Sequence, residues 1–279
     1  MKRFFICFIL MILSSIYLPS EAHSCSSHYY VTYKDYYQEE QNFINCNRHS
    51  LLKETTVYYY SNGSRRTYTY STIYNQDGSI LESGCSNVKH LIYKNIHYFT
   101  FYKNGKYQVI DEKGNILTVK KYKQMKEVAP NKLLVKLEKK YGIIDLHDNI
   151  VVPIKYKKFE QVGKNLFLTK LNGYYGFTDD SNKIIVKNEY EKIKPLYETF
   201  LLKKYGKYGL VNKNGQIILQ AEYDSIKKIG EYILIEKNNK YGVLDSAGNI
   251  IAEPIYKKIR LERNSLEGKL PKKTWATLL

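Results

Sequence analysis

The chain has 279 residues, of which 43% are hydrophobic and 25% charged, so it is long enough and apolar enough to form a hydrophobic core. Beyond one N-terminal run, no stretch is apolar enough to cross a bilayer, which argues against a multi-spanning membrane protein. The formal net charge of +17 comes from lysines scattered along the chain. Scattered charge attracts anionic polymers or lipid head groups weakly, and it does not read a specific nucleic acid.

The segment 1–22 has the layout of a secretory signal peptide. Lys2 and Arg3 precede an apolar run from Phe4 to Leu18, and the small-residue site Ser20-Glu21-Ala22 follows. The run is shorter than the roughly 18 to 20 residues that a membrane-spanning helix needs. We therefore predict export after cleavage behind Ala22, so that the mature protein is periplasmic, attached to the outer surface or secreted.

Three cysteines follow the signal peptide, and all of them precede the regular part of the chain. Cys46 and Cys85 are a candidate disulfide, although spacing does not determine connectivity. A lipid-modified Cys25 is an alternative that would leave the other two as an even pair. A nucleophilic Cys85 near His90 and His97 is a further alternative, but a half-cystine is the more common identity of a cysteine in an exported chain.

Residues 23 to 65 contain clustered tyrosines in strand-like stretches, and we interpret them as a lead-in or cap segment. Exposed tyrosine rings stack on sugars or anchor protein contacts. Because these rings follow no repeat, they are the candidate binding residues: Tyr29, Tyr30, Tyr36, Tyr37, Tyr58, Tyr59 and Tyr60. Residues 66 to 98 contain the turn-like sequence from Tyr74 to Ile80 and are predicted to be a degenerate repeat.

Residues 99 to 260 carry a tandem repeat with two columns of tyrosine. Tyrosines of the first column recur at nearly constant spacing, and a second tyrosine follows each of them at one fixed offset, as Tyr122 follows Tyr107. The period of about 33 to 34 residues is typical of small units that stack because none can bury its own apolar face. We interpret ten tyrosines as structural repeat positions: Tyr107, Tyr141, Tyr175, Tyr208, Tyr241, Tyr122, Tyr156, Tyr190, Tyr223 and Tyr256.

Within each unit, the residues after the first tyrosine predict a strand and a tight turn. The next residue is glycine in every unit except the first, where it is Gln108, and two mainly β-branched or bulky apolar residues follow. An Asp or Asn comes four residues after the tyrosine, and a Gly, Asn or Asp comes three positions later. The first of these accepts backbone N–H groups and the second tolerates positive φ, as a hairpin loop requires.

Two further strands complete the predicted unit. One starts at an isoleucine nine residues after the first tyrosine and continues through the second tyrosine, with a bend where Pro153 and Pro254 interrupt ladder donation in two units. The other precedes the next tyrosine and closes on it through turns such as Asn104-Gly105 and Asn172-Gly173. The predicted fold is all-β: tandem three-stranded antiparallel meander repeats, one per period, in a curved or propeller-like array.

The units from Lys207 to Ile226 and from Lys240 to Ile259 show the pattern best. It resembles the WG-repeat family of bacterial proteins, whose units carry an aromatic-Gly pair, a D-x-x-G-like turn and a later E-Y-x-x-I. Tyrosine replaces the family's tryptophan in every unit of residues 99 to 260. The resemblance implies a β-rich repeat domain of exported or surface proteins, and it carries over no catalytic residue because the motif is structural.

The remaining motifs predict no catalytic residue, metal ligand set or cofactor. The chain has no His-Glu-x-x-His, Cys-x-x-Cys or Gly-x-Ser-x-Gly sequence, and each turn offers only one or two carboxylates, too few for a calcium loop. Residues 261 to 279 are predicted to be a basic tail. We therefore expect a non-catalytic binding or scaffolding protein of the bacterial cell envelope or exterior, with a protein or glycan partner. A hydrolase or toxin-related activity in residues 23 to 98 is the alternative.

Overall fold

The computed structural model describes the backbone of residues 25–34, 37–46, 49–59, 65–75, 77–262, 265–270 and 275–278. Side chains are described in residues 70–75, 77–261, 266–270 and 276–278. Within these ranges the regular structure consists of β-strands, and no helix there is long and apolar enough to span a membrane. The predicted signal peptide, Tyr36 and Tyr60 lie outside the described residues.

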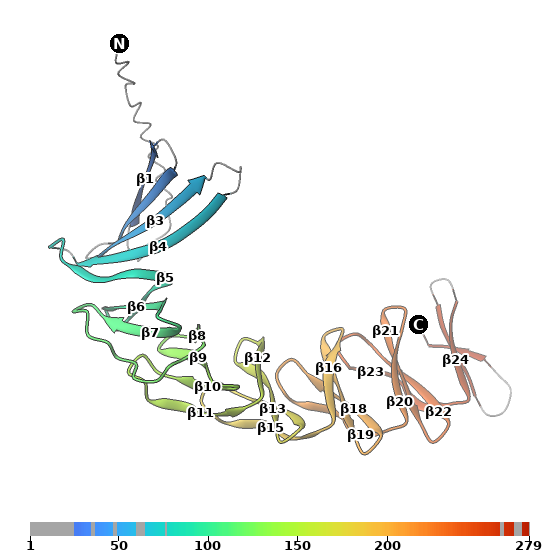
Figure 1. The fold of residues 1–279 in the computed structure, drawn as a ribbon. Coiled ribbons are helices and arrows are strands. Elements are labelled where there is room, and N and C mark those ends of the chain that lie inside the picture. The colour runs from blue at the N-terminus through green and yellow to red at the C-terminus, as the bar shows by residue number, and fades with distance from the viewer. Residues whose placement is uncertain are drawn as a thin grey trace, which may run out of the picture. The chain divides into compact units, whose positions relative to one another are not determined.

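The chain divides into two compact units, residues 1–125 with 146–148 and residues 126–145 with 149–279. In the first unit seven antiparallel strands form one sheet in chain order (Figure 1). They are β1 (Cys25–Lys34), β2 (Tyr37–Cys46), β3 (His49–Tyr59), β4 (Arg65–Asn75), β5 (Ile80–Tyr93), β6 (Ile96–Lys103) and β7 (Lys106–Asp111). The predicted lead-in segment, the degenerate repeat and the start of the array therefore contribute strands to a single sheet.

The rest of the chain forms a series of antiparallel meanders, four with four strands and a last one with three. The first two are β8 (Gln124–Ala129), β9 (Lys132–Leu137), β10 (Lys140–Ile144) and β11 (Ile150–Tyr156), then β12 (Lys158–Gly163), β13 (Leu166–Leu171), β14 (Tyr174–Thr178) and β15 (Ile184–Tyr190). The next two are β16 (Lys192–Leu196), β17 (Thr199–Lys204), β18 (Lys207–Asn212) and β19 (Ile217–Tyr223), then β20 (Ser225–Ile229), β21 (Tyr232–Lys237), β22 (Lys240–Leu244) and β23 (Ile250–Tyr256). The last contains β24 (Lys258–Glu262), β25 (Ser265–Lys269) and β26 (Trp275–Thr277).

The predicted all-β fold of tandem antiparallel meander repeats is thus confirmed, and four of the sheets have a fourth strand. The predicted long second strand is two strands in different sheets, because β11 ends at Tyr156 and β12 begins at Lys158 in the next sheet. At this corner the Tyr156 and Phe159 rings meet edge to face, with centroids 5.4 Å apart. Each four-stranded sheet therefore combines strands from two successive sequence repeats, which ties neighbouring repeats together.

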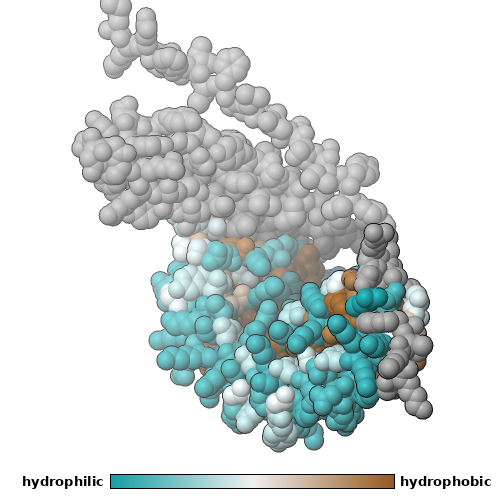
Figure 2. Space-filling model, turned by 90° about the vertical axis from the view of Figure 1, so that its right-hand side faces the viewer, coloured by the Kyte–Doolittle hydropathy of each residue, from teal (hydrophilic) through white to brown (hydrophobic). Residues whose placement is uncertain are grey.

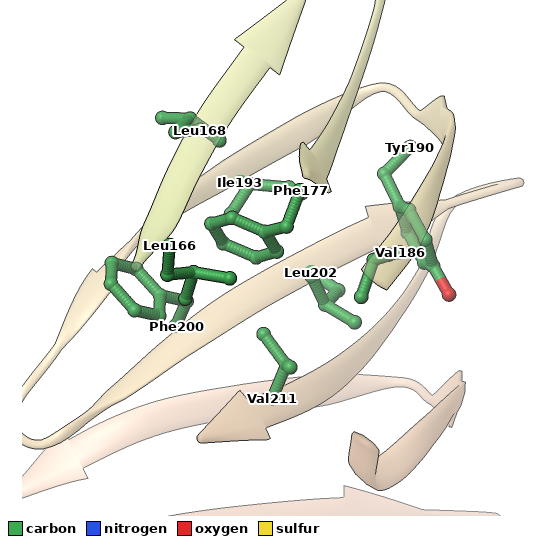
Figure 3. Packing of buried hydrophobic residues seen from close by; sticks show 9 residues of the cluster. All are labelled: Leu166, Leu168, Phe177, Val186, Tyr190, Ile193, Phe200, Leu202 and Val211. Atoms are coloured by element: carbon green, nitrogen blue, oxygen red, sulfur yellow. The ribbon is translucent and has the colours of Figure 1, made fainter. Parts of the chain in front are cut away.

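In the second compact unit, the hydrophobic cores lie between successive sheets. Figure 3 shows one of them, in which Phe177 and Tyr190 of the β12–β15 sheet face Phe200 and Leu202 of the β16–β19 sheet. The Phe177 and Phe200 ring centroids are 5.2 Å apart. The sheet that follows is joined to β16–β19 by a second cluster of the same kind. An inner sheet therefore buries apolar side chains on both faces, as stacked repeats require.

The glycine column is explained by a close approach of two backbones. Between the pairs Tyr208↔Tyr223 and Leu210↔Leu219, β18 advances by two residues and β19 by four, so β19 bulges over Gly209. A Cβ atom at Gly209 would lie 2.5 Å from the Leu219 carbonyl oxygen. Equivalent contacts of 2.5 to 2.6 Å occur at three other positions: Gly142, Gly176 and Gly242.

The first sequence repeat, which begins at Tyr107, lacks this glycine, and its strand pairing differs accordingly. Gln108 is buried there, and beyond β7 the pairing is limited to the isolated bridges Tyr107↔Tyr122 and Ile110↔Ile116. A side chain at position 108 is incompatible with the close backbone approach seen in the other units. The departure of one residue from the repeat is therefore accompanied by the loss of a fourth strand in that unit.

The predicted turns are confirmed. Asp179 Oδ1 accepts the backbone N–H groups of Ser181 and Lys183, each at 2.8 Å, and Asn182 has φ +69°. The same arrangement at Asp245 is partly buried, which opposes ionisation, but hydrogen bonds from Asn249, Gly248 and Ala247 lower the pKa of its carboxyl group overall. These carboxylates are occupied by backbone donors, in agreement with turn capping.

The prediction of a basic tail at residues 261–279 is wrong, because β25 and β26 lie in this segment and pair with β24. Trp275, the single tryptophan of the chain, follows Tyr241 at the spacing of the first tyrosine column. In register it lies opposite Lys269, as Tyr208 lies opposite Lys203. The repeat therefore continues into this segment, and its next aromatic position is a tryptophan.

Candidate functional site

The two tyrosine columns differ in burial. The second column is buried in Tyr122, Tyr156 and Tyr190, which are at most 4% exposed, and is half-buried in Tyr223 and Tyr256. Burial raises the pKa of the Tyr190 hydroxyl, and Figure 3 shows this hydroxyl pointing away from the cluster. All five tyrosines of the first column are half-buried. The second column is thus the more deeply buried, and the first leaves part of its rings accessible.

Lysines accompany the first column on three successive sheets. Lys136, Lys170 and Lys203 are the cross-strand partners of Tyr141, Tyr175 and Tyr208, respectively. Their Nζ atoms lie 5.2, 4.6 and 5.9 Å from the ring centroids, within the range of a cation–π contact. The same chemistry is thus presented once per sheet. Figure 2 shows that hydrophilic residues cover most of the described surface in that view.

A pocket of about 130 Å³ lies on one of these sheets, and we call it the lysine pocket. It is lined by Lys192 and Lys194 of β16, Leu201 and Lys203 of β17, and Tyr208 of β18. The register pairs Lys192 with Lys203, Lys194 with Leu201, and Lys203 with Tyr208, so these side chains share one face. Lys192 and Lys194 are exposed, whereas Leu201 is only 6% exposed. The pocket therefore combines an apolar floor with three ammonium groups.

In other sheets, carboxylates offset part of the positive charge on the face that corresponds to the lysine pocket. On β12, Lys158 forms an ion pair with Glu160 at 2.7 Å, and on β22 the Tyr241 hydroxyl donates to Glu236 Oε1 at 3.2 Å. In the last sheet Arg260 pairs with Glu267 at 2.8 Å. In the lysine pocket, Lys194 occupies the position of Glu160 and Lys203 that of Glu236, while Leu201 occupies the position of Glu267. No carboxylate therefore stands at these positions of the β16–β19 sheet, although paired lysines recur in other sheets.

Comparison with known proteins supports the repeat assignment. The family described as "WG containing repeat" matches residues 141–175, 208–241 and 241–266, which include successive aromatic-Gly positions of the array. Residues 141–266 thus carry repeats of the WG-repeat family. No curated protein matches it in sequence. Among solved structures it is similar to Kluyveromyces lactis Hsv2, with 12% identity over 76% of this chain and 81% of that chain and a TM-score of 0.32.

Of the residues that line the lysine pocket, Tyr208 lies in a matched repeat, while the four others lie between the first and second matches. Sequence reasoning missed this pocket because lysines occur in every repeat and their scatter hides a local excess. A comparison of equivalent positions would have found it: Lys158, Lys192 and Ser225 occupy one column, and Lys170, Lys203 and Glu236 occupy its cross-strand partner. The signal lies two residues further along the first column, where Lys194 replaces Glu160, combined with lysine in place of Glu236.

The candidate binding tyrosines precede the WG repeats. Tyr29 and Tyr30 lie in β1, Tyr37 in β2, and Tyr58 and Tyr59 in β3. Tyr37 is the register partner of Tyr58, which brings these two positions together. Tyr30 pairs with Gln41 and Tyr29 with Asn42. Their role in binding stays a prediction.

The candidate disulfide between Cys46 and Cys85 is not formed. Cys85 is a free, buried cysteine of β5, and β3 and β4 separate β5 from β2, which contains Cys46. Three strand spacings amount to roughly 14 Å, about twice the largest Cα separation that a disulfide tolerates. The register instead places Cys25 directly opposite Cys46 in the β1–β2 pair.

The surroundings of Cys85 do not activate it as a nucleophile. Its side chain packs with Ile73, Phe99 and Phe101, and burial, reinforced by the charge of Glu82, raises the pKa of the thiol to about 12. Among the described side chains, its Sγ donates only to the Ser83 carbonyl, at 3.6 Å. The His90 and His97 rings are joined to each other, with Nε2 and Nδ1 2.8 Å apart. The two histidines therefore supply no base to this thiol.

Peptide mapping without reductant tests the cysteine arrangement. We expect an alkylating reagent to modify Cys85 only after denaturation, because the thiol is buried and its pKa is raised. Any disulfide is expected between Cys25 and Cys46, since antiparallel partners have Cα atoms about 4.5 to 5.5 Å apart. A peptide linking Cys46 to Cys85 would contradict the strand order.

Within the part of the chain whose side chains are described, no group of three or more His, Cys, Asp or Glu residues is arranged to hold a metal ion. The aspartates of the WG-repeat turns are spaced one repeat apart, and Asp111 and Asp145 each bind their own turn. The lysine pocket, in contrast, brings cations, an apolar floor and an aromatic ring together.

Proposed function

We propose that the chain is a non-catalytic binding or scaffolding protein of the bacterial cell envelope or exterior, with a protein or glycan partner. The supporting observation is the recurrence of a lysine over a half-buried tyrosine on three successive sheets. Aromatic rings with nearby cations suit both sugar rings and protein side chains. Because the stacked sheets present this pair repeatedly, one partner chain can engage several sheets, which strengthens weak single contacts.

The array has the properties of a scaffold. Its sheets are held by apolar cores on both faces, and its hairpin turns are closed by side-chain hydrogen bonds. Polar side chains at outward positions are thereby kept at regular spacing on a rigid framework. Location at the envelope is inferred from the signal-like sequence of residues 1–22 and from the exported proteins that carry similar repeats.

Co-sedimentation of the full chain with isolated envelope particles tests this function. We expect the triple variant Lys136→Glu, Lys170→Glu and Lys203→Glu to lose most of the binding, because each change removes the cation from one tyrosine. The matched control is Lys113→Glu, Lys164→Glu and Lys213→Glu, which alters three exposed lysines by the same net charge. The control is expected to bind like the wild type.

Two results would contradict the proposal. Equal loss in both triple variants would mean that general charge attraction, and no defined surface, causes binding. Unchanged binding in both variants would show that the first tyrosine column does not take part in binding. That result is expected if the function lies in residues 23–98. Protease-treated and periodate-oxidised particles then separate a protein partner from a glycan partner, because only the first treatment destroys protein and only the second opens sugar rings.

A further inference from the structure

The lysine pocket holds positive charge that the protein itself does not balance. Lys192 and Lys203 are direct cross-strand partners, and like charges in that position repel. Glu191 approaches Lys203 only to 3.7 Å, and this pair is solvent-exposed. Lys192 and Lys194 form no ion pair with the described side chains. An anion in the pocket would relieve this repulsion, and a single charged group is enough to do so.

The other two lining residues indicate what carries that charge. Leu201 provides an apolar floor and the half-buried Tyr208 a partly accessible aromatic ring, and such surfaces pack against the C–H faces of sugars. A pocket of about 130 Å³ is smaller than the roughly 300 to 1,000 Å³ of sites for drug-sized ligands. We propose that the lysine pocket binds one acidic sugar unit of a glycan, with its carboxylate at Lys192 and Lys194 and its ring against Tyr208. This inference rests on the proposed binding function and specifies the ligand of one site.

The neighbouring sheets argue against an extended polyanion. A nucleic-acid backbone or an anionic membrane surface is bound through many cations along a continuous path. Here the equivalent face carries Glu160 in the preceding sheet and Glu236 in the following one. A long chain of phosphates would meet these carboxylates on both sides of the pocket. A glycan with isolated acidic units avoids this repulsion, because its neutral units can lie over the sheets that carry Glu160 and Glu236.

Calorimetry with trigalacturonic acid and its fully methyl-esterified form tests the inference on the full chain. We expect the acid to bind, with an affinity that falls as salt rises, and the ester to bind at least about tenfold more weakly. The double variant Lys192→Gln and Lys194→Gln is expected to lose about tenfold in affinity for the acid, because it removes both unpaired cations. Lys158→Gln on β12 is the matched control, since that lysine is already paired with Glu160. It is expected to leave the affinity unchanged.

Each opposing result has a distinct meaning. Equal binding of acid and ester, or no binding of the acid at about 10 mM, would overturn the proposal. Poly-glutamate that binds as tightly as the trisaccharide would show that the ring is not recognised and that the occupant is an acidic protein. Circular dichroism of the double variant confirms its fold. If the wild type still sediments with envelope particles while the acid does not bind, the pocket assignment fails and the proposed function remains. If the wild type does not sediment, the function itself fails.

Discussion

Replacing Gly209 with alanine is expected to destabilise the array by on the order of 3 kcal/mol or more, because the new methyl group has no room. Its Cβ would lie 2.5 Å from the Leu219 carbonyl oxygen and 2.9 Å from the Ala221 nitrogen, both backbone atoms of the bulged strand β19. Backbone atoms cannot move aside as a flexible side chain can. The β18–β19 pairing must therefore separate, which exposes part of the core between this sheet and the next.

Urea unfolding followed by circular dichroism measures this loss, with Gly206→Ala as the control. Gly206 lies in the turn before β18, has φ +74° and has open space around its Cα, so an alanine there meets only backbone strain. That strain costs about 1 kcal/mol. A clear excess for Gly209→Ala over Gly206→Ala supports the close backbone approach. Equal losses in the two variants would show that the glycine column is maintained for conformation alone.

The second large effect is expected for Tyr156→Ala, which removes a side chain that is only 2% exposed. Its ring packs with Phe159 and with the Ile143 and Val152 side chains at the corner between two sheets. Deleting a buried aromatic side chain costs about 3 to 5 kcal/mol through lost contacts and the remaining cavity. We expect a loss of this size in the free energy of unfolding.

Tyr141→Ala is the matched control, because Tyr141 is the register partner of Tyr156 in the same sheet. Its ring is half-buried and lies beside Lys136, so its truncation is expected to cost only about 1 to 2 kcal/mol. Tyr156→Phe keeps the ring and is expected to remain within about 1 kcal/mol of the wild type. Similar losses for Tyr141→Ala and Tyr156→Ala would contradict the different burial of the two columns.

This difference between the columns is one that spacing does not reveal. Both columns recur with the same period, and all ten tyrosines are therefore equivalent as repeat positions. In the structure, the chain turns a corner after Tyr156 and carries Phe159 into the next sheet, where both contribute to one core. Tyr141 packs against the margin of the same core, is half-buried and lies beside Lys136 on the partner strand. The burial of each ring thus depends on its place within the core between two sheets, and that is a property of stacking.

The lysine pocket likewise could not be predicted from the sequence alone. Lys192, Lys194 and Lys203 are ordinary lysines in a lysine-rich chain, and two of them are separated from the third by a hairpin. Register brings Lys192 opposite Lys203 and leaves the pair without the carboxylate that balances the equivalent face elsewhere. The cysteines give a second example, because strand order places two strands between Cys46 and Cys85.

Local chemistry alone was enough to predict the repeat period, the all-β class and the turns, since an Asp such as Asp179 caps its turn through bonds within a few residues. Residue types record such short-range constraints directly. The fourth strand of the four-stranded sheets, the continuation of the array to Trp275 and the grouping of charges arise from contacts between strands that local sequence does not specify. Those contacts depend on register and on how sheets stack, so only the tertiary structure determines them.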